Sequence, residues 1–120
     1  MNKKRLISYC DSLVSKIVIA RDRRCICCGT SENLTCGHFF KRGFMAIRFD
    51  LVNCNAQCAS CNSLHNEDTE PYKTKFKEKY GMDEYLRLCH EKDKIRRWKD
   101  FELEELKEKL KQILEDYKGS

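Results

Sequence analysis

The N-terminal part of the chain has the apolar periodicity of an amphipathic helix. Between residues 2 and 21, hydrophobic side chains recur every three or four positions and fall near one helical face. These positions are Leu6, Cys10, Leu13, Val14, Ile17 and Val18. The pattern predicts a helix over 2–21 that packs on the rest of the chain through this face.

The pattern changes over residues 34–52, where short apolar runs rich in Phe are separated by Gly37 and Gly43. Short apolar runs bounded by glycine are typical of strands and turns. We therefore predict two strands joined by a loop, the strands at about 34–40 and 46–52 and the loop at Lys41–Met45.

A helical pattern returns after Cys58. A short helix is expected to begin within CASCNSLHN, and a second within DTEPYKTKFKEKYG. For the second, Asp68 or Thr69 can serve as the N-cap, Pro71 suits the first turn, and Gly81 fits just past the end.

Two further helices are predicted towards the C-terminus. Asp83 can cap one that continues through residue 90. In the charged tail at 95–117, apolar residues repeat at 3-4-3-4 spacing: Leu103, Leu106, Leu110, Ile113 and Tyr117. This seam spans only about two heptads, so we expect it to pack on the N-terminal helix or on the helix at 83–90, with a homodimer seam as the alternative.

The predicted elements mix helices with a small hairpin, so the fold class is α+β. With 120 residues the chain fits a single domain, divided into an N-terminal helix (1–24), a core (25–66) and a helical C-terminal extension (67–120). No run of 18 apolar residues and no signal peptide is present, which predicts no membrane span and a cytoplasmic location.

Charge is distributed unevenly along the chain. Residues 1–66 carry 10 Lys or Arg against 4 Asp or Glu, whereas residues 67–120 carry 14 against 15. The basic surplus therefore lies in the half that contains most of the cysteines. Such a surplus fits phosphate neutralisation by a nucleic-acid-binding surface, although a solvated basic surface has the same composition.

The chain has nine cysteines, and four of them form two Cys-x-x-Cys pairs. An odd count with two such pairs fits metal binding better than a disulfide framework. We predict a structural zinc site with four thiolate ligands: Cys25, Cys28, Cys58 and Cys61. Such a site can contribute about 10–16 kcal/mol to folding, which would hold a small core together.

The remaining cysteines have less specific environments. Cys27 is ambiguous, because a Cys-x-Cys spacing is too short for the usual ligand pair. Cys36 and Cys54 are expected to be small buried side chains near the strands, and Cys10 and Cys89 to belong to helix cores.

Four polar residues near the cysteine pairs could carry chemistry. His38 is a candidate general base, since neutral imidazole can accept a proton near pH 7. Asn62 could ligate a divalent ion through its side-chain oxygen, and His65, one turn on, could be a second ligand or a phosphate contact. Each has a simpler alternative: His38 bonded to a backbone group, Asn53 in a turn, Asn62 as a helix cap, and His65 as a surface residue.

The motifs ARDRRCICCG, CGHFFKRG, RFDLVNCNAQC and CN occur in this order. Their order resembles the HNH, or His-Me finger, nucleases and phage endonuclease VII, and it is similar to the NinG, or Rap, recombination proteins of lambdoid phages. The resemblance covers about residues 17–90. It implies a zinc-stapled ββα-metal core, in which Asn53 positions the loop that carries His38.

The resemblance also implies a function. The chain would be a metal-dependent endonuclease, with Mg²⁺ or Mn²⁺ at the catalytic site, acting on branched or recombining DNA in a phage-infected bacterium. The catalytic residues would be His38, Asn53 and Asn62, and phage recombination or replication proteins could be partners. Many HNH sites have an aspartate directly before the base histidine, but this chain has Gly37 there. Asp50 is expected to be structural, paired with Arg48 or a backbone group.

Basic residues near the predicted hairpin are candidates for phosphate contacts. They are Lys41, Arg42, Arg48, Arg21, Arg23 and Arg24. Two alternatives to an enzyme remain at this point: a non-catalytic nucleic-acid binder with the same zinc fold, and a module whose C-terminal helix docks a recombination partner.

Overall fold

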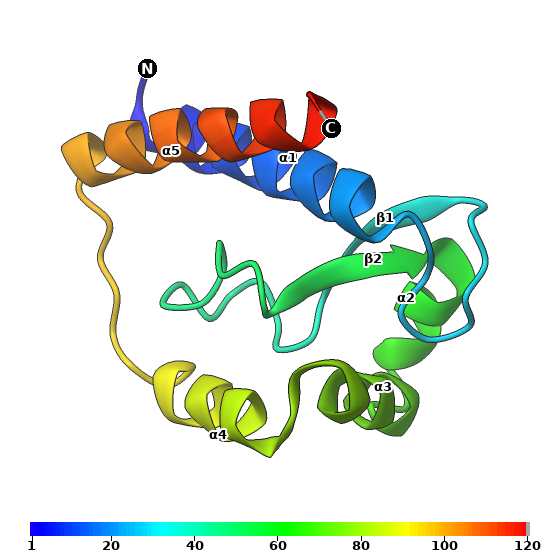
Figure 1. Ribbon diagram of the computed structural model, residues 1–120. Coiled ribbons are helices and arrows are strands. Elements are labelled where there is room, and N and C mark those ends of the chain that lie inside the picture. Colours follow the sequence, from blue (N-terminus) through cyan, green and yellow to red (C-terminus); the bar gives the residue numbers. More distant parts are fainter. Residues whose placement is uncertain (120) are drawn as a thin grey trace.

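A computed structural model describes residues 1–119 of the chain (Figure 1). Within them, a two-stranded sheet lies between a helix pair on one side and smaller helices on the other, which confirms the α+β class. The elements are α1 (Lys3–Asp22), β1 (Leu34–His38), β2 (Cys54–Cys58), α2 (Ala59–His65), α3 (Glu70–Tyr80), α4 (Met82–Glu91) and α5 (Asp100–Lys118).

The N-terminal helix forms as its periodicity predicts. Asn2 caps α1, because its Oδ1 accepts a hydrogen bond of 2.9 Å from the backbone N–H of Arg5. All six predicted apolar positions are buried, and they meet Leu103, Leu110 and Leu114 of α5. The two helices lie side by side in Figure 1, so the α1–α5 pair forms one hydrophobic core of the protein.

The hairpin differs from the prediction in its second strand. β1 occupies 34–38 as expected, but its antiparallel partner is 54–58 rather than 46–52, with His38 opposite Cys54 and Leu34 opposite Cys58. The predicted strand at 46–52 is a series of turns. Asp50 favours a turn there, since its Oδ1 accepts from the N–H of Val52 at 2.9 Å.

The second core lies under α3 and α4. It contains Phe39, Ile47, Tyr72, Phe76 and Leu88, and Phe39 stacks on Phe76 with ring centroids 4.7 Å apart. This packing attaches the residues after β1 to the helices that follow α2. The predicted zinc core therefore rests between two hydrophobic clusters.

The caps of the smaller helices are only partly as predicted. Thr69 precedes α3 but makes no side-chain cap, while Asp68 accepts from the N–H of Glu70 at 3.1 Å. Gly81, at φ 87°, both ends α3 and precedes α4. Asp83 is therefore inside the first turn of α4, and its predicted role as the N-cap is wrong.

The last helix begins later than the pattern predicts. Residues 95–99 form an extended link, visible between α4 and α5 in Figure 1, and α5 begins at Asp100. The link is held by Trp98, whose Nε1 donates to the Met45 carbonyl at 3.1 Å. Glu102 then accepts from the N–H of Lys99 at 2.9 Å, which fixes the start of the helix.

The seam of α5 faces α1. Leu103 and Leu110 are buried as expected, but the third buried position is Leu114, and Tyr117 is 36% exposed. A straight helix has 3.6 residues per turn, so a 3.5-residue repeat drifts off the contact face. The seam therefore packs on the N-terminal helix, which is one of the expected arrangements, and the homodimer stays a prediction.

None of the helices within residues 1–119 combines the length and the apolar composition that crossing a bilayer requires.

Candidate functional site

The four predicted zinc ligands converge at one end of the hairpin. The Sγ atoms of Cys25, Cys28, Cys58 and Cys61 all lie within 4.8 Å of one another. Cys28 Sγ and Cys58 Sγ are 3.7 Å apart. Tetrahedral zinc with bonds of about 2.3 Å to sulfur requires sulfur atoms about 3.8 Å apart, so the thiols fit this ion.

Local backbone geometry prepares these thiols for a cation. The N–H groups of Cys27 and Cys28 point at Cys25 Sγ at 3.4 and 3.5 Å, and the N–H of Cys61 points at Cys58 Sγ at 3.4 Å. Burial disfavours ionisation of Cys25, but the surrounding backbone N–H groups outweigh it and lower its pKa to about 7. The cluster is thus a candidate zinc site.

Cys27 lies outside this group. Its sulfur is the acceptor for the side-chain amide of Gln57 at 3.5 Å, and desolvation raises its pKa. Cys10 is buried in the α1–α5 core, as expected, where burial raises its pKa to about 11. Cys54 is fully buried, whereas Cys36 and Cys89 are only partly buried.

His38 is the last residue of β1 and lies half-buried beside a cleft. Its Nε2 is 3.1 Å from the backbone carbonyl of Arg48. A carbonyl can only accept, so Nε2 carries the proton and the lone pair of the neutral ring is on Nδ1. Burial lowers the pKa of His38 below its ordinary value of 6.5, against the effect of that hydrogen bond.

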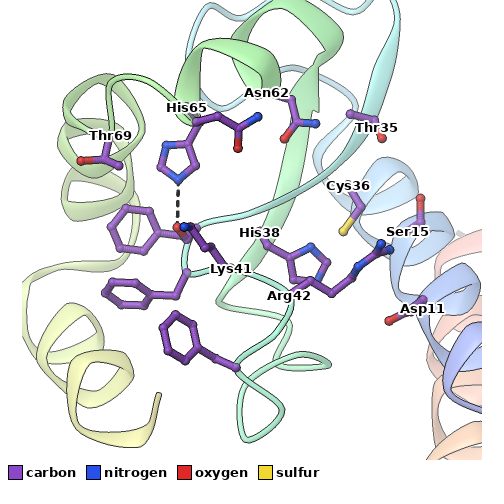
Figure 2. A pocket seen from close by; sticks show the side chains of 14 residues that line it. Asp11, Ser15, Thr35, Cys36, His38, Lys41, Arg42, Asn62, His65 and Thr69 are labelled. Carbon is purple, nitrogen blue, oxygen red and sulfur yellow. Dashed lines mark hydrogen bonds between the residues drawn. The ribbon is translucent and has the colours of Figure 1, made fainter. Parts of the chain in front are cut away.

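The cleft has a volume of about 800 Å³ and brings distant parts of the chain together. His38 lines it from β1, Asn62 and His65 from α2, and Asp11 from α1. Figure 2 shows the α2 residues on one side and His38 with Arg42 on the other. The predicted base and the predicted ligand therefore share one cavity.

Asn53 is buried directly behind this cleft. Its Oδ1 accepts from the N–H of Phe40 at 2.9 Å, and its Nδ2 donates to the carbonyls of Phe40 at 3.0 Å and Ile47 at 3.4 Å. The side chain thus ties both ends of the loop that follows His38. These hydrogen bonds fix the backbone of the loop, which fits a positioning role for Asn53.

His65 is held differently from the prediction of a metal ligand. Its Nε2 donates to the Phe39 carbonyl at 2.8 Å, the dashed contact in Figure 2, and its Nδ1 is buried without a partner among the described residues. Neither ring nitrogen is presented to the cleft in this arrangement. Asn62 is half-buried and lines the cleft directly.

Gly37 cannot be replaced by a carboxylate without rearrangement. A Cβ at this position would lie 2.1 Å from Gln57 Oε1 and 2.8 Å from Gln57 Cβ. The one acidic side chain among the described residues lining the cleft is Asp11, which sequence analysis missed. Asp11 is bound by Arg48, with Arg48 Nε 3.0 Å from Oδ1.

Of the two partners predicted for Asp50, Arg48 or a backbone group, the structure shows the backbone group. Asp50 accepts from the backbone of Val52, as allowed for, but its ion pair is with Arg87 of α4, Nη1 to Oδ2 at 2.8 Å, and not with Arg48. The carboxylate joins the turn before β2 to α4. It is therefore structural.

The six predicted phosphate-binding residues have different environments. Lys41 and Arg42 are exposed at the rim of the cleft, and neither side chain has a hydrogen bond or ion pair within residues 1–119. Arg23 and Arg24 are exposed near the zinc cluster, where they bond only to backbone carbonyls. Arg48 is engaged with Asp11.

Arg21 is half-buried, and its guanidinium is engaged within the protein. It donates to Asp22 and to the carbonyls of Leu51 and Cys54, at 2.7, 2.8 and 3.0 Å. Together with Asp22, which also accepts from the N–H of Ala56 at 2.9 Å, it attaches α1 to β2. We therefore leave Arg21 out of any DNA-binding surface.

A polar network under the hairpin is not predicted from the sequence. Asn55 Nδ2 donates to Tyr72 Oη at 3.1 Å, and Tyr72 Oη donates to the Gly37 carbonyl at 2.7 Å. This network supports the residue before His38 from α3. The only signal for it in the sequence is the alternation of polar and small residues in CNAQC.

Comparison with known proteins gives a family. The model of the family described as "Bacteriophage Lambda NinG protein" matches residues 2–119. No curated protein and no solved structure matches the chain. Because the family match extends over nearly the whole sequence, the chain belongs to the NinG family of bacteriophage proteins.

Proposed function

We propose that this protein is a metal-dependent endonuclease of the HNH, or His-Me finger, type that hydrolyses phosphodiester bonds in branched or recombining DNA. The observation that carries the proposal is the shared cleft. A histidine with a free Nδ1 lone pair and a lowered pKa faces the same cavity as the Asn62 amide and two unpaired basic side chains.

His38 acts as the general base. Its Nε2–H is fixed on the Arg48 carbonyl, so the ring is oriented and its Nδ1 can accept a proton from water. Since its pKa lies below 6.5, the imidazole is mostly neutral at pH 7. Asn53 is a positioning residue, because it holds the loop that follows His38.

Lys41 and Arg42 provide the phosphate contacts. Both are exposed at the cleft and carry no intramolecular ion pair within the described residues, so their charges are available to DNA. Exposed Arg23 and Arg24 extend the basic surface towards the zinc cluster. Contacts of this kind bind DNA without reading its sequence.

A catalytic Mg²⁺ or Mn²⁺ would be held by Asn62 Oδ1, and Asp11 is the one carboxylate among the described residues that line the same cleft. Mg²⁺ in phosphoryl-transfer sites takes few protein ligands and completes its shell with water and substrate phosphate, which fits this sparse donor set. Such an ion supplies charge stabilisation on the phosphate and the departing oxygen. The ion pair of Asp11 with Arg48 would make binding weak without DNA.

The proposal is tested by incubating the chain, loaded with one equivalent of zinc, with duplex, flap, D-loop and four-way DNA in the presence of Mg²⁺ or Mn²⁺. We expect cuts in at least one branched substrate, and none when Mg²⁺ and Mn²⁺ are both left out. Binding of the same DNA without cutting in either ion would overturn the proposal.

The alternative function is a non-catalytic DNA-binding module. It is favoured by one observation: the only carboxylate among the described residues lining the cleft is already paired with an arginine. Under this alternative the zinc cluster and basic rim bind branched DNA for phage recombination proteins. The same substrate panel separates the two functions, because a binder shifts the DNA but leaves it intact.

A further inference from the structure

We propose that Cys36, His38 and Cys54 form a second metal site, separate from the four-cysteine cluster, which takes a thiophilic divalent ion such as Zn²⁺. From the sequence alone, both cysteines are expected to be small buried side chains. The structure instead places the ligand atoms of all three residues within 4.8 Å of one another.

Strand register brings the three residues together. Cys36 and His38 are two positions apart on β1, so their side chains leave the same face of the hairpin. Cys54 of β2 lies directly opposite His38, and Cys36 is opposite Ala56. The three therefore form a triangle on the face that packs towards α1, as Figure 2 shows for Cys36 and His38.

The donor set matches a known coordination type. Tetrahedral zinc with two sulfurs at about 2.3 Å and one nitrogen at about 2.0–2.1 Å needs donors roughly 3.5–3.8 Å apart, so a small closure of this triangle suffices. Two thiolates and a neutral imidazole cancel the charge of the ion. Three protein ligands with the fourth position open is the arrangement of catalytic or exchangeable zinc, rather than of a closed structural site.

The orientation of His38 also favours ligation. Nε2–H donates to the Arg48 carbonyl, and with this second-shell bond kept, Nδ1 would be the nitrogen that ligates the ion. The Cys54 thiol donates to the same carbonyl at 3.5 Å. Binding of the ion would release the Cys54 proton and that of Cys36.

The site is accessible from the cleft. Cys36 and His38 both line it, while Cys54 closes the site from the buried side. A water or anion could therefore occupy the fourth position. A direct disulfide is less well placed, because Cys36 and Cys54 are diagonal rather than opposite in the register.

Occupancy would regulate the activity. On the proposed function, the ligand atom on His38 is the atom that accepts a proton from water, so an ion bound there removes the base. A first equivalent of zinc would fill the four-cysteine cluster and support the fold. A second would inhibit cleavage.

The test is metal stoichiometry in the reduced, full-length chain loaded with Co²⁺ or Zn²⁺. We expect two ions per chain, with thiolate-to-Co²⁺ absorption from both sites. Cys36→Ser should lower the number of bound ions to one per chain. His38→Ala should do the same, and it replaces the serine variant in the test if that variant misfolds. Cys89→Ser is the matched control and should keep two, because Cys89 belongs to no ligand group within the described residues.

Three results would overturn the proposal: one ion per wild-type chain, two ions retained by both Cys36→Ser and His38→Ala, or a mass lower by two hydrogens that shows a Cys36–Cys54 disulfide instead. The number of metal ions bound per chain is measured without DNA and does not depend on whether the protein cleaves it. A chain that binds two ions, yet cuts no DNA even when it holds only the first equivalent of zinc, would refute the proposed function and leave the second metal site standing.

Discussion

The position directly before His38 has room only for glycine. The Cα of Gly37 faces Gln57 so closely that a side chain at this position would collide with the Gln57 Cβ as well as with its amide. The carboxylate that many HNH enzymes carry at this position is therefore excluded by packing. Asp11, from another element, is the carboxylate that approaches the cleft instead.

Gly37→Ala should lower the free energy of unfolding by about 1–3 kcal/mol, because overpacking displaces Gln57 and the strand. Urea denaturation measures this change. The matched control is Gly43→Ala, where an added Cβ meets nothing within 4 Å, and it should stay within about 0.5 kcal/mol of the wild type. Equal stability of the two variants would contradict the packing at Gly37.

The pH dependence of the proposed cleavage should follow His38. Its pKa in the folded protein is below 6.5, so the lone pair on Nδ1 is lost only as the pH falls below that value. We expect the acid limb of kcat/KM to have its midpoint below pH 6.5. The unfolded chain binds this proton more readily, so the contribution of His38 to stability also declines as the pH falls below 6.5.

A pH profile of cleavage, together with an NMR titration of the His38 ring, checks this prediction. The titration of the ring and the acid limb should coincide. A midpoint above pH 6.5 in the free protein would mean that the His38 environment stabilises the imidazolium, contrary to its burial.

At the scale of elements, α5 holds the fold through one face. Leu103, Leu110 and Leu114 pack along α1, with Leu106 and Ile113 partly buried beside them. The extended link at 95–99 lets the chain cross from α4 to α1, as Figure 1 shows. The helix thereby supports α1, from which Asp11 reaches the cleft.

Leu110→Ala should cost about 2–5 kcal/mol of stability, because Leu110 is 2% exposed and its removal leaves a cavity between the two helices. Tyr117→Ala, on the same helix but 36% exposed, is the control and should cost far less. Thermal unfolding followed by circular dichroism compares the two. If the Tyr117 variant lost as much stability, the predicted heptad seam, rather than the observed one, would describe the packing.

Local sequence patterns predicted the helices and the two cysteine pairs, whereas the second strand and its buried polar residues depend on contacts between distant parts of the chain. The spacing of Cys25 with Cys28 and the periodicity of α1 are both set within a few residues of the chain. The strand at 54–58 was missed because its buried Asn55 and Gln57 are polar in sequence. Asn55 is satisfied by Tyr72 from α3, a partner that the local sequence does not reveal.

In the candidate site, too, some residues can be predicted from the local sequence and others cannot. His38 and Asn62 could be singled out by their positions beside the cysteines. The approach of Asp11 depends on how α1 crosses the hairpin, and the engagement of Arg21 depends on its contact with β2. The hydrophobic periodicity within α1 or within the hairpin does not predict these contacts between elements.

At the scale of the whole molecule, the four-cysteine cluster joins the segment after α1 to β2 and α2. Its metal is expected to contribute about 10–16 kcal/mol, which exceeds the total stability of many small domains. Without zinc, the segment after α1 would lose its four-thiolate link to β2 and α2. The fold and the cleft should therefore depend on the metal.

Removal of zinc with a chelator should abolish cooperative thermal unfolding, and one equivalent of Zn²⁺ should restore it. Cys28→Ser should reproduce the loss, while Cys89→Ser, outside the cluster, should unfold like the wild type. Circular dichroism melts with and without added Zn²⁺ provide the measurement. An unchanged melting temperature after complete chelation would show that the thiols are not a structural zinc site.

The most direct test of the nuclease proposal compares two histidine substitutions in single-turnover cleavage of branched DNA. His38→Ala should slow cutting by ~10²-fold or more, because it removes the general base, and should leave DNA binding unchanged. His90→Ala, on the exposed surface of α4 away from the cleft, should cut at the wild-type rate. Cleavage by the His38 variant at the wild-type rate would contradict the account.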